Sequence, residues 1–459
     1  MEKLEIGDDL LKVGDIQACI DDRPDDGIFR VRSKLFADEE LFELEQKHIF
    51  ERTWSFLGLD SQVQKPNDFI TTFIGRTPVI VIRNAVGTLG AFLNVCRHKG
   101  ALLARTESGN RRTLVCSYHG WTYDSSGRNV NIKDKDAGCY PSEFDQQNHD
   151  LLPLARFESY KGLLFGSLNS DVPPLEVFLG EAKPLVDLAM EQGPDGMELV
   201  PGRVVYTFEG NWKLQADNGS DSYHLTSTHP SLMSIVQRRE QEKVGNVGAK
   251  QYDWRKRFTQ TGGIFTFKHG HTAVWLNQGQ PENRPLHKNI EHVRARVGDL
   301  RAEWMMKSRN LTIFPNLQIA DATSLLIRTF RPLAVDKTEM RMWCMAPIGE
   351  MSEVRSWRIR QFEDFFNVSG LATPDDTALY EDAQIGFRAE MMDWLQGYQR
   401  GATALSPGPN EAARELGMKP LASSVGPYNM QTETCFQPLY REWARLLQAG
   451  VSGTPAYET

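Results

Sequence analysis

Two short Cys–His pairs constrain this chain more than any other feature. Cys96-x-His98 is followed, after 17 residues, by Cys116-x-x-His119. Each pair comes after β-rich sequence, so each is expected on a loop at the end of a strand. Two thiols and two imidazoles on a pair of loops suggest metal ligation. A Cys2His2 zinc site is an alternative, but zinc fingers order their ligands as a Cys pair and then a His pair, which fits poorly here.

A [2Fe–2S] cluster of the Rieske kind fits better, because it takes two thiolates on one iron and two imidazoles on the other. The predicted cluster ligands are therefore Cys96, His98, Cys116 and His119. Neutral imidazoles remove negative charge from such a cluster and raise its reduction potential above that of an all-Cys cluster. A glycine follows each histidine within two positions, and it would let the backbone turn tightly beside the sulfurs.

A second constellation lies about a hundred residues further on and contains Asp221, His224 and His229. Non-haem Fe(II) that activates O2 is held by two imidazoles and one carboxylate on one face, with the opposite face open. We expect Asp221 and His224 to share a helix face, because they are three residues apart. His224 and His229 are five apart and would diverge on a regular helix, so the helix should open or end near Pro230.

The two constellations together resemble the large subunits of Rieske non-haem iron aromatic-ring-hydroxylating dioxygenases, and the resemblance covers nearly the whole chain. Cys96-x-His98 and Cys116-x-x-His119-Gly-Trp resemble the family's cluster motif, and the segment from Asp221 to His229 resembles its mononuclear-iron motif. The resemblance implies that His224 and His229 ligate iron. It also implies that Asp221 hydrogen-bonds a Rieske histidine of the neighbouring subunit and so links the two metals.

The same resemblance implies that the third iron ligand lies at the end of the segment Arg360–Asp376. In the family the second acid of an Asp-Asp pair usually binds iron, so Asp376 is the predicted ligand and Asp375 the alternative. Thr-Pro-Asp-Asp is also typical of a helix N-terminus, where acids are favourable, and both interpretations can hold together. Asp217 stands where the family often has Glu, and no role is predicted for it.

Within the family, Arg360–Asp376 and Gly270–Trp275 resemble the benzoate, toluate and anthranilate dioxygenases, with salicylate hydroxylases close by. This implies hydroxylation of an aryl carboxylate to a cis-diol or catechol-type product. A carboxylate in an apolar pocket needs a charged or donor partner, for which Arg328 and His271 are candidates. His269 and His271 are also expected on one face of a hairpin, as pocket lining or as a metal pair. A Rieske mono-oxygenase acting on salicylate or a related substituted arene is the alternative function. A pure electron-transfer ferredoxin would need neither His224 and His229 nor this length.

The resemblance implies an all-β Rieske domain inserted in an α+β catalytic domain of antiparallel sheet plus helices. We expect the N-terminal helical part of the catalytic domain at 1–52, the Rieske domain at 53–170 and the rest of the catalytic domain at 171–459. It further implies a small β subunit in an α3β3 assembly, or an α3 homotrimer. Because no Gly-x-Gly-x-x-Gly dinucleotide fingerprint occurs, NADH should act through a separate reductase, with or without a ferredoxin.

Composition and local patterns exclude several classes. A net charge of -8 argues against a nucleic-acid partner, and six sparse cysteines do not form a disulfide framework. No apolar run approaches a membrane span and the acidic N-terminus lacks an apolar core, so a cytoplasmic protein is expected. Periodicity predicts helices over 38–52, 182–192, 353–366 and 378–397, strands over 69–74, 79–82, 113–116, 202–208 and 324–330, and a hairpin over 265–275.

Overall fold

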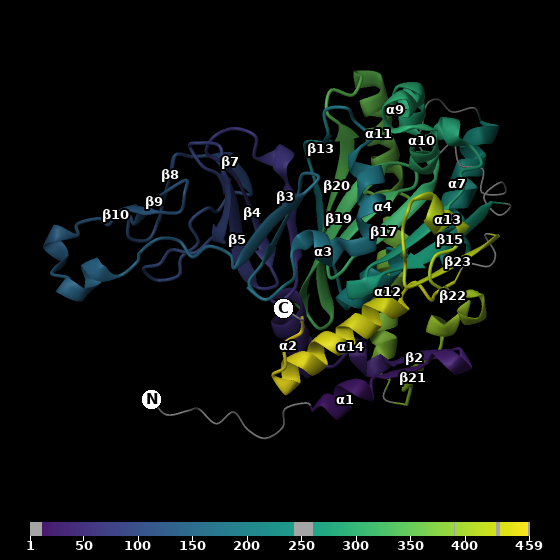
Figure 1. Ribbon diagram of the computed structural model, residues 1–459, viewed down its shortest axis with the longest axis horizontal. Coiled ribbons are helices and arrows are strands. Elements are labelled where there is room, and N and C mark those ends of the chain that lie inside the picture. Colours follow the sequence, from purple (N-terminus) through teal and green to yellow (C-terminus); the bar gives the residue numbers. More distant parts are fainter. Residues whose placement is uncertain (1–11, 243–259, 390, 428–431, 458–459) are drawn as a thin grey trace. The chain divides into compact units, whose positions relative to one another are not determined.

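The computed structural model of the chain describes residues 12–242, 260–389, 391–427 and 432–457. These form two compact units (Figure 1). One comprises residues 50–175, and the other comprises the remaining described residues. The acidic N-terminal residues 1–11, on which the expectation about a leader segment rests, lie outside the described part.

The smaller unit is built from three antiparallel sheets. Their strand orders are β11-β12-β3, β6-β5-β4-β7 and β10-β9-β8. The strands are β3 (Ser55–Leu59), β4 (Asp68–Ile74), β5 (Thr77–Arg83), β6 (Leu89–Leu93), β7 (Ser108–Asn110), β8 (Thr113–Val115), β9 (Thr122–Asp124), β10 (Asn129–Asn131), β11 (Arg156–Tyr160) and β12 (Leu163–Ser167). The strands expected over 69–74, 79–82 and 113–116 are therefore present as β4, β5 and β8.

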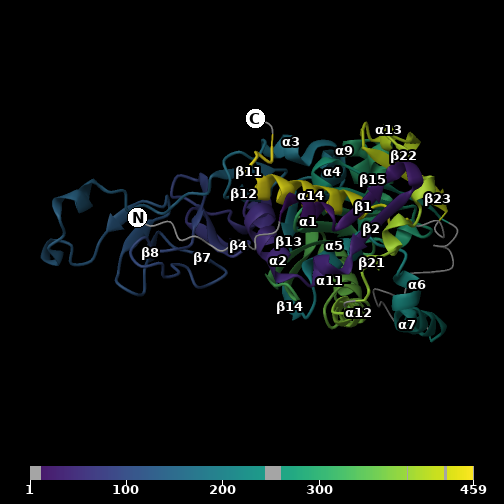
Figure 2. The ribbon, with the colours of Figure 1, turned by 90° about the horizontal axis from the view of Figure 1, so that it is seen from below.

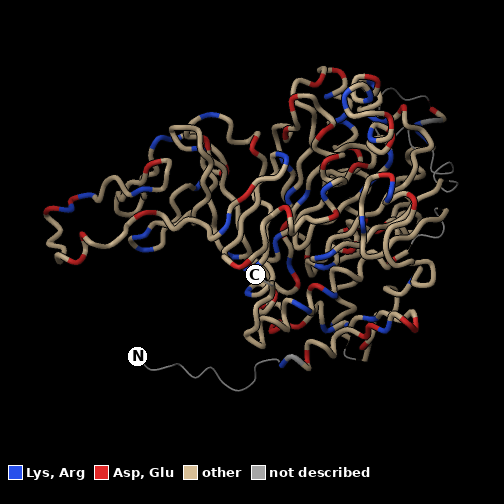
Figure 3. Tube along the Cα trace, viewed as in Figure 1, with Lys and Arg blue, Asp and Glu red and all other residues tan. Residues whose placement is uncertain are grey.

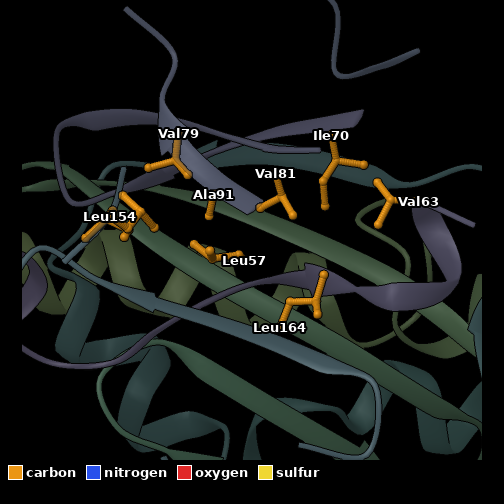
Figure 4. Packing of buried hydrophobic residues seen from close by; sticks show 9 residues of the cluster. Leu57, Val63, Ile70, Val79, Val81, Ala91, Leu154 and Leu164 are labelled. Carbon is orange, nitrogen blue, oxygen red and sulfur yellow. The ribbon is translucent and has the colours of Figure 1, made fainter. Parts of the chain in front are cut away.

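Strand β5 is apolar on both faces because both faces are covered. Val79 and Val81 pack with Leu57 and Leu164 in one core cluster, which Figure 4 shows between the strands. Ile80 and Ile82 pack into a second cluster on the opposite face. A strand buried on both faces gives a continuous apolar run rather than an alternating one, as the sequence Val79–Ile82 does.

The larger unit is organised around a ten-stranded antiparallel sheet of order β13-β20-β19-β18-β17-β16-β15-β23-β22, with β14 also paired to β20. A small sheet of order β1-β2-β21 lies elsewhere in this unit. The large sheet comprises β13 (Met197–Leu199), β14 (Val204–Phe208), β15 (Thr261–Thr266), β16 (Thr272–Leu276), β17 (Ser308–Ile313), β18 (Leu317–Asp321), β19 (Leu325–Ala334), β20 (Lys337–Pro347), β22 (Ser406–Pro407) and β23 (Ala422–Pro427). The small sheet comprises β1 (Ile20–Arg23), β2 (Ile28–Arg32) and β21 (Trp394–Leu395).

Helices pack on the large sheet. The longer helices are α2 (Glu39–Glu45), α4 (Lys183–Met190), α5 (Trp212–Asn218), α7 (Pro230–Gln241), α9 (Ile290–Val297), α10 (Asp299–Met306), α11 (Ser352–Phe365), α12 (Thr373–Phe387) and α14 (Gln437–Ser452). Helix α14 packs against α2 and against the short helix α1 (Val13–Gln17), as Figure 2 also shows. Phe362 and Phe366, at the C-terminal end of α11, pack on Leu326 of β19 and Met342 of β20. That face of the sheet carries the site described below.

An all-β unit inserted in an α+β unit confirms the predicted fold class. The helices expected over 182–192 and 353–366 are α4 and α11, and the helix expected over 38–52 is α2 continued by a π-helical turn, Gln46–Phe50. The helix expected over 378–397 is wrong in its extent, because α12 ends at Phe387. Trp394 instead pairs with Arg32 of β2, so sheet pairing overrides helical periodicity there. Among the described residues, no helix has both the length and the apolarity to span a membrane.

Candidate active site and metal centres

Two loops of the smaller unit carry the Cys–His pairs and fold alike. The first lies between β6 and β7, the second between β8 and β9. In each loop the glycine amide donates to the carbonyl of the cysteine, from Gly100 to Cys96 at 3.0 Å and from Gly120 to Cys116 at 2.9 Å. Both glycines have a φ near +70°, namely 73° and 72°, which side chains rarely tolerate. The sequence therefore builds two equivalent tight turns around the two thiols.

The four side chains converge between these loops. The Nδ1 atoms of His98 and His119 lie 3.0 Å apart, and Cys96 and Cys116 are free thiols, each 2% exposed. Burial, followed by the charge of His119, lowers the pKa of His98, so its neutral, ligating form is favoured. Two buried sulfurs and two facing imidazole nitrogens fit the donor set of a Rieske [2Fe–2S] cluster.

Two aromatic residues support this cluster of ligands. The indole of Trp121 stacks on the His98 ring at 5.0 Å and 10°. The hydroxyl of Tyr123 lies 3.4 Å from Cys96 Sγ and accepts from the Arg97 amide at 3.1 Å. Burial raises the pKa of Tyr123, so the hydroxyl stays available as a donor to sulfur. Tyr123 was not predicted from the sequence, where its position on the strand after the second loop was the available signal.

In the larger unit, the segment after α5 departs from the expectation of one shared helix. Asp221 lies in an irregular segment between α5 and the short helix α6 (Leu225–Thr228), so the prediction that Asp221 and His224 share a helix face is wrong. Gly219 and Ser220 are weak helix formers, and Asp221 Oδ1 accepts from the Tyr223 amide at 2.6 Å in a local turn that competes with the helix. The prediction that the helix breaks near Pro230 is confirmed. His229 separates α6 from α7 with φ -112° and ψ 46°.

This break brings His224, His229 and Asp376 together. Each offers one ligand atom, and these atoms all lie within 4.8 Å of one another. Asp376 Oδ1 lies 3.5 Å from His224 Nε2 and 3.3 Å from His229 Nε2. Asp376 itself stands in the first turn of α12, which fixes its direction. Two imidazoles and one carboxylate in this arrangement fit the donor set of a mononuclear Fe(II) site with open positions.

The outer nitrogens of both imidazoles are held by carboxylates. His224 Nδ1 lies 2.9 Å from Asp221 Oδ2, and His229 Nδ1 lies 3.2 Å from Asp375 Oδ2. A carboxylate that accepts from Nδ1 places the proton there and leaves the Nε2 lone pair free for a metal. Asp376 thus faces both Nε2 atoms, while Asp375 holds one Nδ1 atom. The geometry gives the two adjacent acids different positions, which sequence alone left open.

Asn218 completes the surroundings of the three side chains. Its Nδ2 donates to Asp376 Oδ1 at 3.2 Å and lies 3.4 Å from His224 Nε2. Burial alone would lower the pKa of His224, but the hydrogen bond from its ring to Asp221 and the charges of Asp221 and Asp376 raise it overall. No role was predicted for Asn218 from the sequence, although it directly follows Asp217.

Two cavities reach these residues. One, of about 270 Å³, is lined by Asp217, Asp221, His224, Asp376 and Glu433 among others. Burial raises the pKa of Asp217 to about 8 and that of Glu433 to about 7, so these two carboxyl groups keep their protons to a higher pH than exposed carboxyl groups do. Along the described part of the chain, charges of both signs are interspersed rather than gathered in one region (Figure 3).

The second cavity, of about 60 Å³, is lined by His224, His229 and Asp376 and by Arg328 of β19. One water needs roughly 10–15 Å³ of such space, so this cavity is larger than a single-water void. Arg328 was one of the two candidates for a carboxylate partner, and the structure brings it to the same cavity as the predicted iron ligands.

The other candidate for a carboxylate partner, His271, does not line this cavity. The hairpin predicted over 265–275 is present as β15 and β16, but His269 sits in its tight turn and His271 is fully buried. His271 Nδ1 accepts from the Phe314 amide at 3.1 Å and Nε2 lies 2.9 Å from the Phe178 carbonyl oxygen. Burial lowers its pKa to about 3. With both ring nitrogens in structural hydrogen bonds, His271 neither lines the cavity nor forms a metal pair with His269.

Comparison with known proteins identifies the family of this chain. The family described as ring hydroxylating alpha subunit (catalytic domain) matches residues 198–449, and the Rieske [2Fe-2S] domain matches residues 53–150. The chain belongs to the ring-hydroxylating alpha subunits. Members combine a Rieske [2Fe–2S] cluster with a mononuclear iron, and the donor sets described above fit both.

Curated ring-hydroxylating alpha subunits are similar to it over nearly their whole length. The toluate 1,2-dioxygenase subunit alpha of Pseudomonas putida is 41% identical over 435 residues, which is 93% of each chain. The 2-halobenzoate 1,2-dioxygenase large subunit of Burkholderia cepacia is 40% identical over 442 residues, covering 96% of this chain and 94% of its own. Among solved structures, naphthalene 1,2-dioxygenase from Rhodococcus sp. bound to indole has a TM-score of 0.76 at 25% identity, covering 92% of this chain and 94% of its own.

Proposed function

We propose that this ring-hydroxylating alpha subunit hydroxylates a benzoate-type aryl carboxylate, with electrons that originate from NADH and with O2. The observation that carries the proposal is the convergence of His224, His229 and Asp376 on the wall of a cavity that also contains Arg328. Similarity of about 40% to the toluate and 2-halobenzoate enzymes supports the substrate class, because both names denote enzymes acting on aryl carboxylates.

In this proposal the residues divide between two metal groups. Cys96, Cys116, His98 and His119 would hold the [2Fe–2S] cluster, and His224, His229 and Asp376 would hold the iron. When bound, the cluster supplies electrons one at a time and the iron supplies an open position for O2. For cis-dihydroxylation the balance is one arene, one O2, one NADH and one proton giving one cis-diol and NAD⁺.

Asp221 is proposed as the positioning residue between the two centres. Its Oδ2 holds His224 Nδ1 at 2.9 Å, and its side chain borders the larger, carboxyl-rich cavity. Both positions support a role in which Asp221 orients His224 and couples the iron site to the cluster of a neighbouring subunit. Asp375 would orient His229 in the same way.

The chain would work with partners. The names of its relatives denote one subunit of a larger enzyme, which supports an assembly with a small β subunit as α3β3, with an α3 homotrimer as the alternative. A reductase, with or without a ferredoxin, would deliver the electrons. The proposed domains are 53–170 for the cluster and 1–52 with 171–459 for catalysis, and compact units of 50–175 and the remainder support them.

Labelled oxygen and a substrate panel test this function. The holoenzyme with its reductase should convert benzoate, anthranilate or salicylate in preference to uncharged analogues such as toluene. Two ¹⁸O atoms in the product would establish dioxygenation, and one would establish the mono-oxygenase alternative. Equal or faster coupled turnover of the uncharged analogues would refute the carboxylate assignment and leave ring hydroxylation standing.

A further inference from the structure

Arg328 differs from the other deeply buried arginines among the described residues. The other three are Arg284, Arg309 and Arg358. Arg284 and Arg309 both pair with Asp321, and Arg358 pairs with Glu350 at 2.6 Å. Arg328 is 7% exposed and no carboxylate of the described chain pairs with it. A buried guanidinium without an anion is costly, so a partner from outside the chain is implied.

Within the described chain, the guanidinium of Arg328 is held through its Nε atom only. Its Nε donates to Gln318 Oε1 at 2.8 Å, from the residue directly opposite on β18. Gln318 is fixed in turn, because its Nε2 donates to the carbonyl oxygens of Gln215 and Ala216 at 3.1 and 3.2 Å. The terminal nitrogens Nη1 and Nη2 have no acceptor in the described part of the chain. They form a fixed fork of donors, a geometry that matches a carboxylate.

Further unpaired polar atoms border the same cavity. Thr323 Oγ1 and Asn310 Oδ1 are buried and have no hydrogen-bond partner among the described residues. Thr323 can donate its hydroxyl, and Asn310 can donate its amide or accept from a ring substituent. The remaining wall includes Leu225 and Phe365, which are apolar. The cavity thus combines a cationic, donor-rich part with an apolar part beside the three predicted iron ligands.

We propose that Arg328 binds the carboxylate of the aromatic substrate, with Thr323 as a second donor and the ring against Leu225 and Phe365. This inference rests on the proposed function and names the residue that would give it its substrate class. Anchoring the carboxylate on a strand in the middle of the sheet would fix which ring carbons face the iron ligands, so Arg328 would also set regioselectivity.

The decisive variants are Arg328→Met and Arg328→Lys in the holoenzyme. Arg328→Met removes the charge and should weaken benzoate binding, measured by calorimetry, by roughly 100-fold, while turnover of toluene changes by no more than about 3-fold. Arg328→Lys keeps the charge without the fork and should fall between Arg328→Met and wild type. Thr323→Val should weaken benzoate binding by about 5- to 10-fold.

Arg331→Met is the matched control. Arg331 lies on the opposite face of the same strand and pairs with Glu339, so this variant should bind benzoate as wild type does. Visible Rieske absorption and iron content verify that each variant is intact. Unchanged benzoate affinity in both Arg328 variants, or equal loss of benzoate and toluene turnover, would overturn the role of Arg328. Wild-type enzyme that oxidises toluene but binds no aryl carboxylate would instead overturn the proposed substrate class, and this inference with it.

Discussion

At the scale of single residues, the adjacent acids Asp375 and Asp376 should behave differently. Asp376 Oδ1 faces both Nε2 atoms, so Asp376→Asn should lose most of the mononuclear iron. Asp375 only holds His229 Nδ1, so Asp375→Asn should keep a bound iron with affinity lowered by about 10- to 100-fold. Metal analysis after dialysis measures both, with Rieske absorption as the internal standard. Loss of iron in Asp375→Asn but not in Asp376→Asn would reverse the assignment.

Asp221→Asn should separate metal binding from turnover. The amide oxygen can still accept from His224 Nδ1, but the bond loses its charge and weakens. We expect both metal groups to be retained and NADH-coupled product formation to fall by about 10-fold or more. Steady-state coupling measured beside iron content checks this. A variant that couples at the wild-type rate would remove Asp221 from the route between the centres.

Asp217 should make stability depend on pH. Burial raises its pKa from 3.8 to about 8 in the folded chain, so between these values the unfolded chain loses a proton that the folded chain keeps. Stability therefore falls as pH rises through this window. Asp217→Asn should remove that penalty, since its amide oxygen can still accept from Tyr398 and Tyr440, which now donate at 2.9 and 2.8 Å.

The gain in the unfolding midpoint of Asp217→Asn over wild type should thus be small at pH 4 and grow toward pH 8, where it corresponds to a few kcal/mol. Thermal unfolding followed at a series of pH values measures it. A gain that is the same at every pH would show that burial of this carboxyl has no titration cost.

At the scale of elements, the close approach of α5 to β18 positions both the iron ligands and Arg328. A Cβ at Gly219 would come within 1.8 Å of Gln318 Nε2, and Gln318 is 1% exposed and fully hydrogen-bonded. Gly219→Ala should therefore destabilise the fold by about 1–3 kcal/mol and weaken benzoate binding, because Gln318 can no longer hold the guanidinium.

Gly386→Ala on α12 is the control for this substitution. A Cβ at Gly386 would have no neighbouring atom within 4 Å, and the φ of this residue is ordinary, so this change should stabilise by up to about 1 kcal/mol. Chemical denaturation and calorimetry compare the two variants. Gly219→Ala with wild-type stability and affinity would mean that Gln318 moves aside freely.

The structural elements also explain which features of the site could be predicted from the sequence. The two Cys–His loops were predictable because each is local, with ligands and turn glycines within five residues. The break at His229 was predictable because five-residue spacing and Pro230 exclude a continuous helix. The irregular conformation of Asp221 was missed, because a side-chain turn outcompeted helical periodicity. The surroundings of Arg328 could not be predicted from the sequence, because they depend on the pairing of β17, β18 and β19 and on the position of α5.

At the scale of the whole molecule, the two predicted metal groups lie in separate compact units and should be removable separately. A ferrous chelator should lower the unfolding midpoint of the catalytic unit, because iron binds the folded state only, and leave Rieske absorption unchanged. His98→Ala should do the reverse and abolish Rieske absorption while iron stays bound. Calorimetry and visible spectra follow both. A chelator effect that persists in His224→Ala would show that it does not act through the mononuclear site.

The predicted iron ligands and the residues proposed to bind substrate come from different structural elements, and this affects how the substrate range of the enzyme can evolve. The predicted iron ligands come from the α5–α7 segment and the start of α12, whereas Arg328, Thr323 and Asn310 come from the sheet or its strand ends. Substitutions on the strands can therefore alter which compounds are accepted without disturbing the ligands that handle oxygen. Laboratory evolution toward uncharged pollutants would begin at positions 310, 323 and 328, and the helical segment would be left untouched.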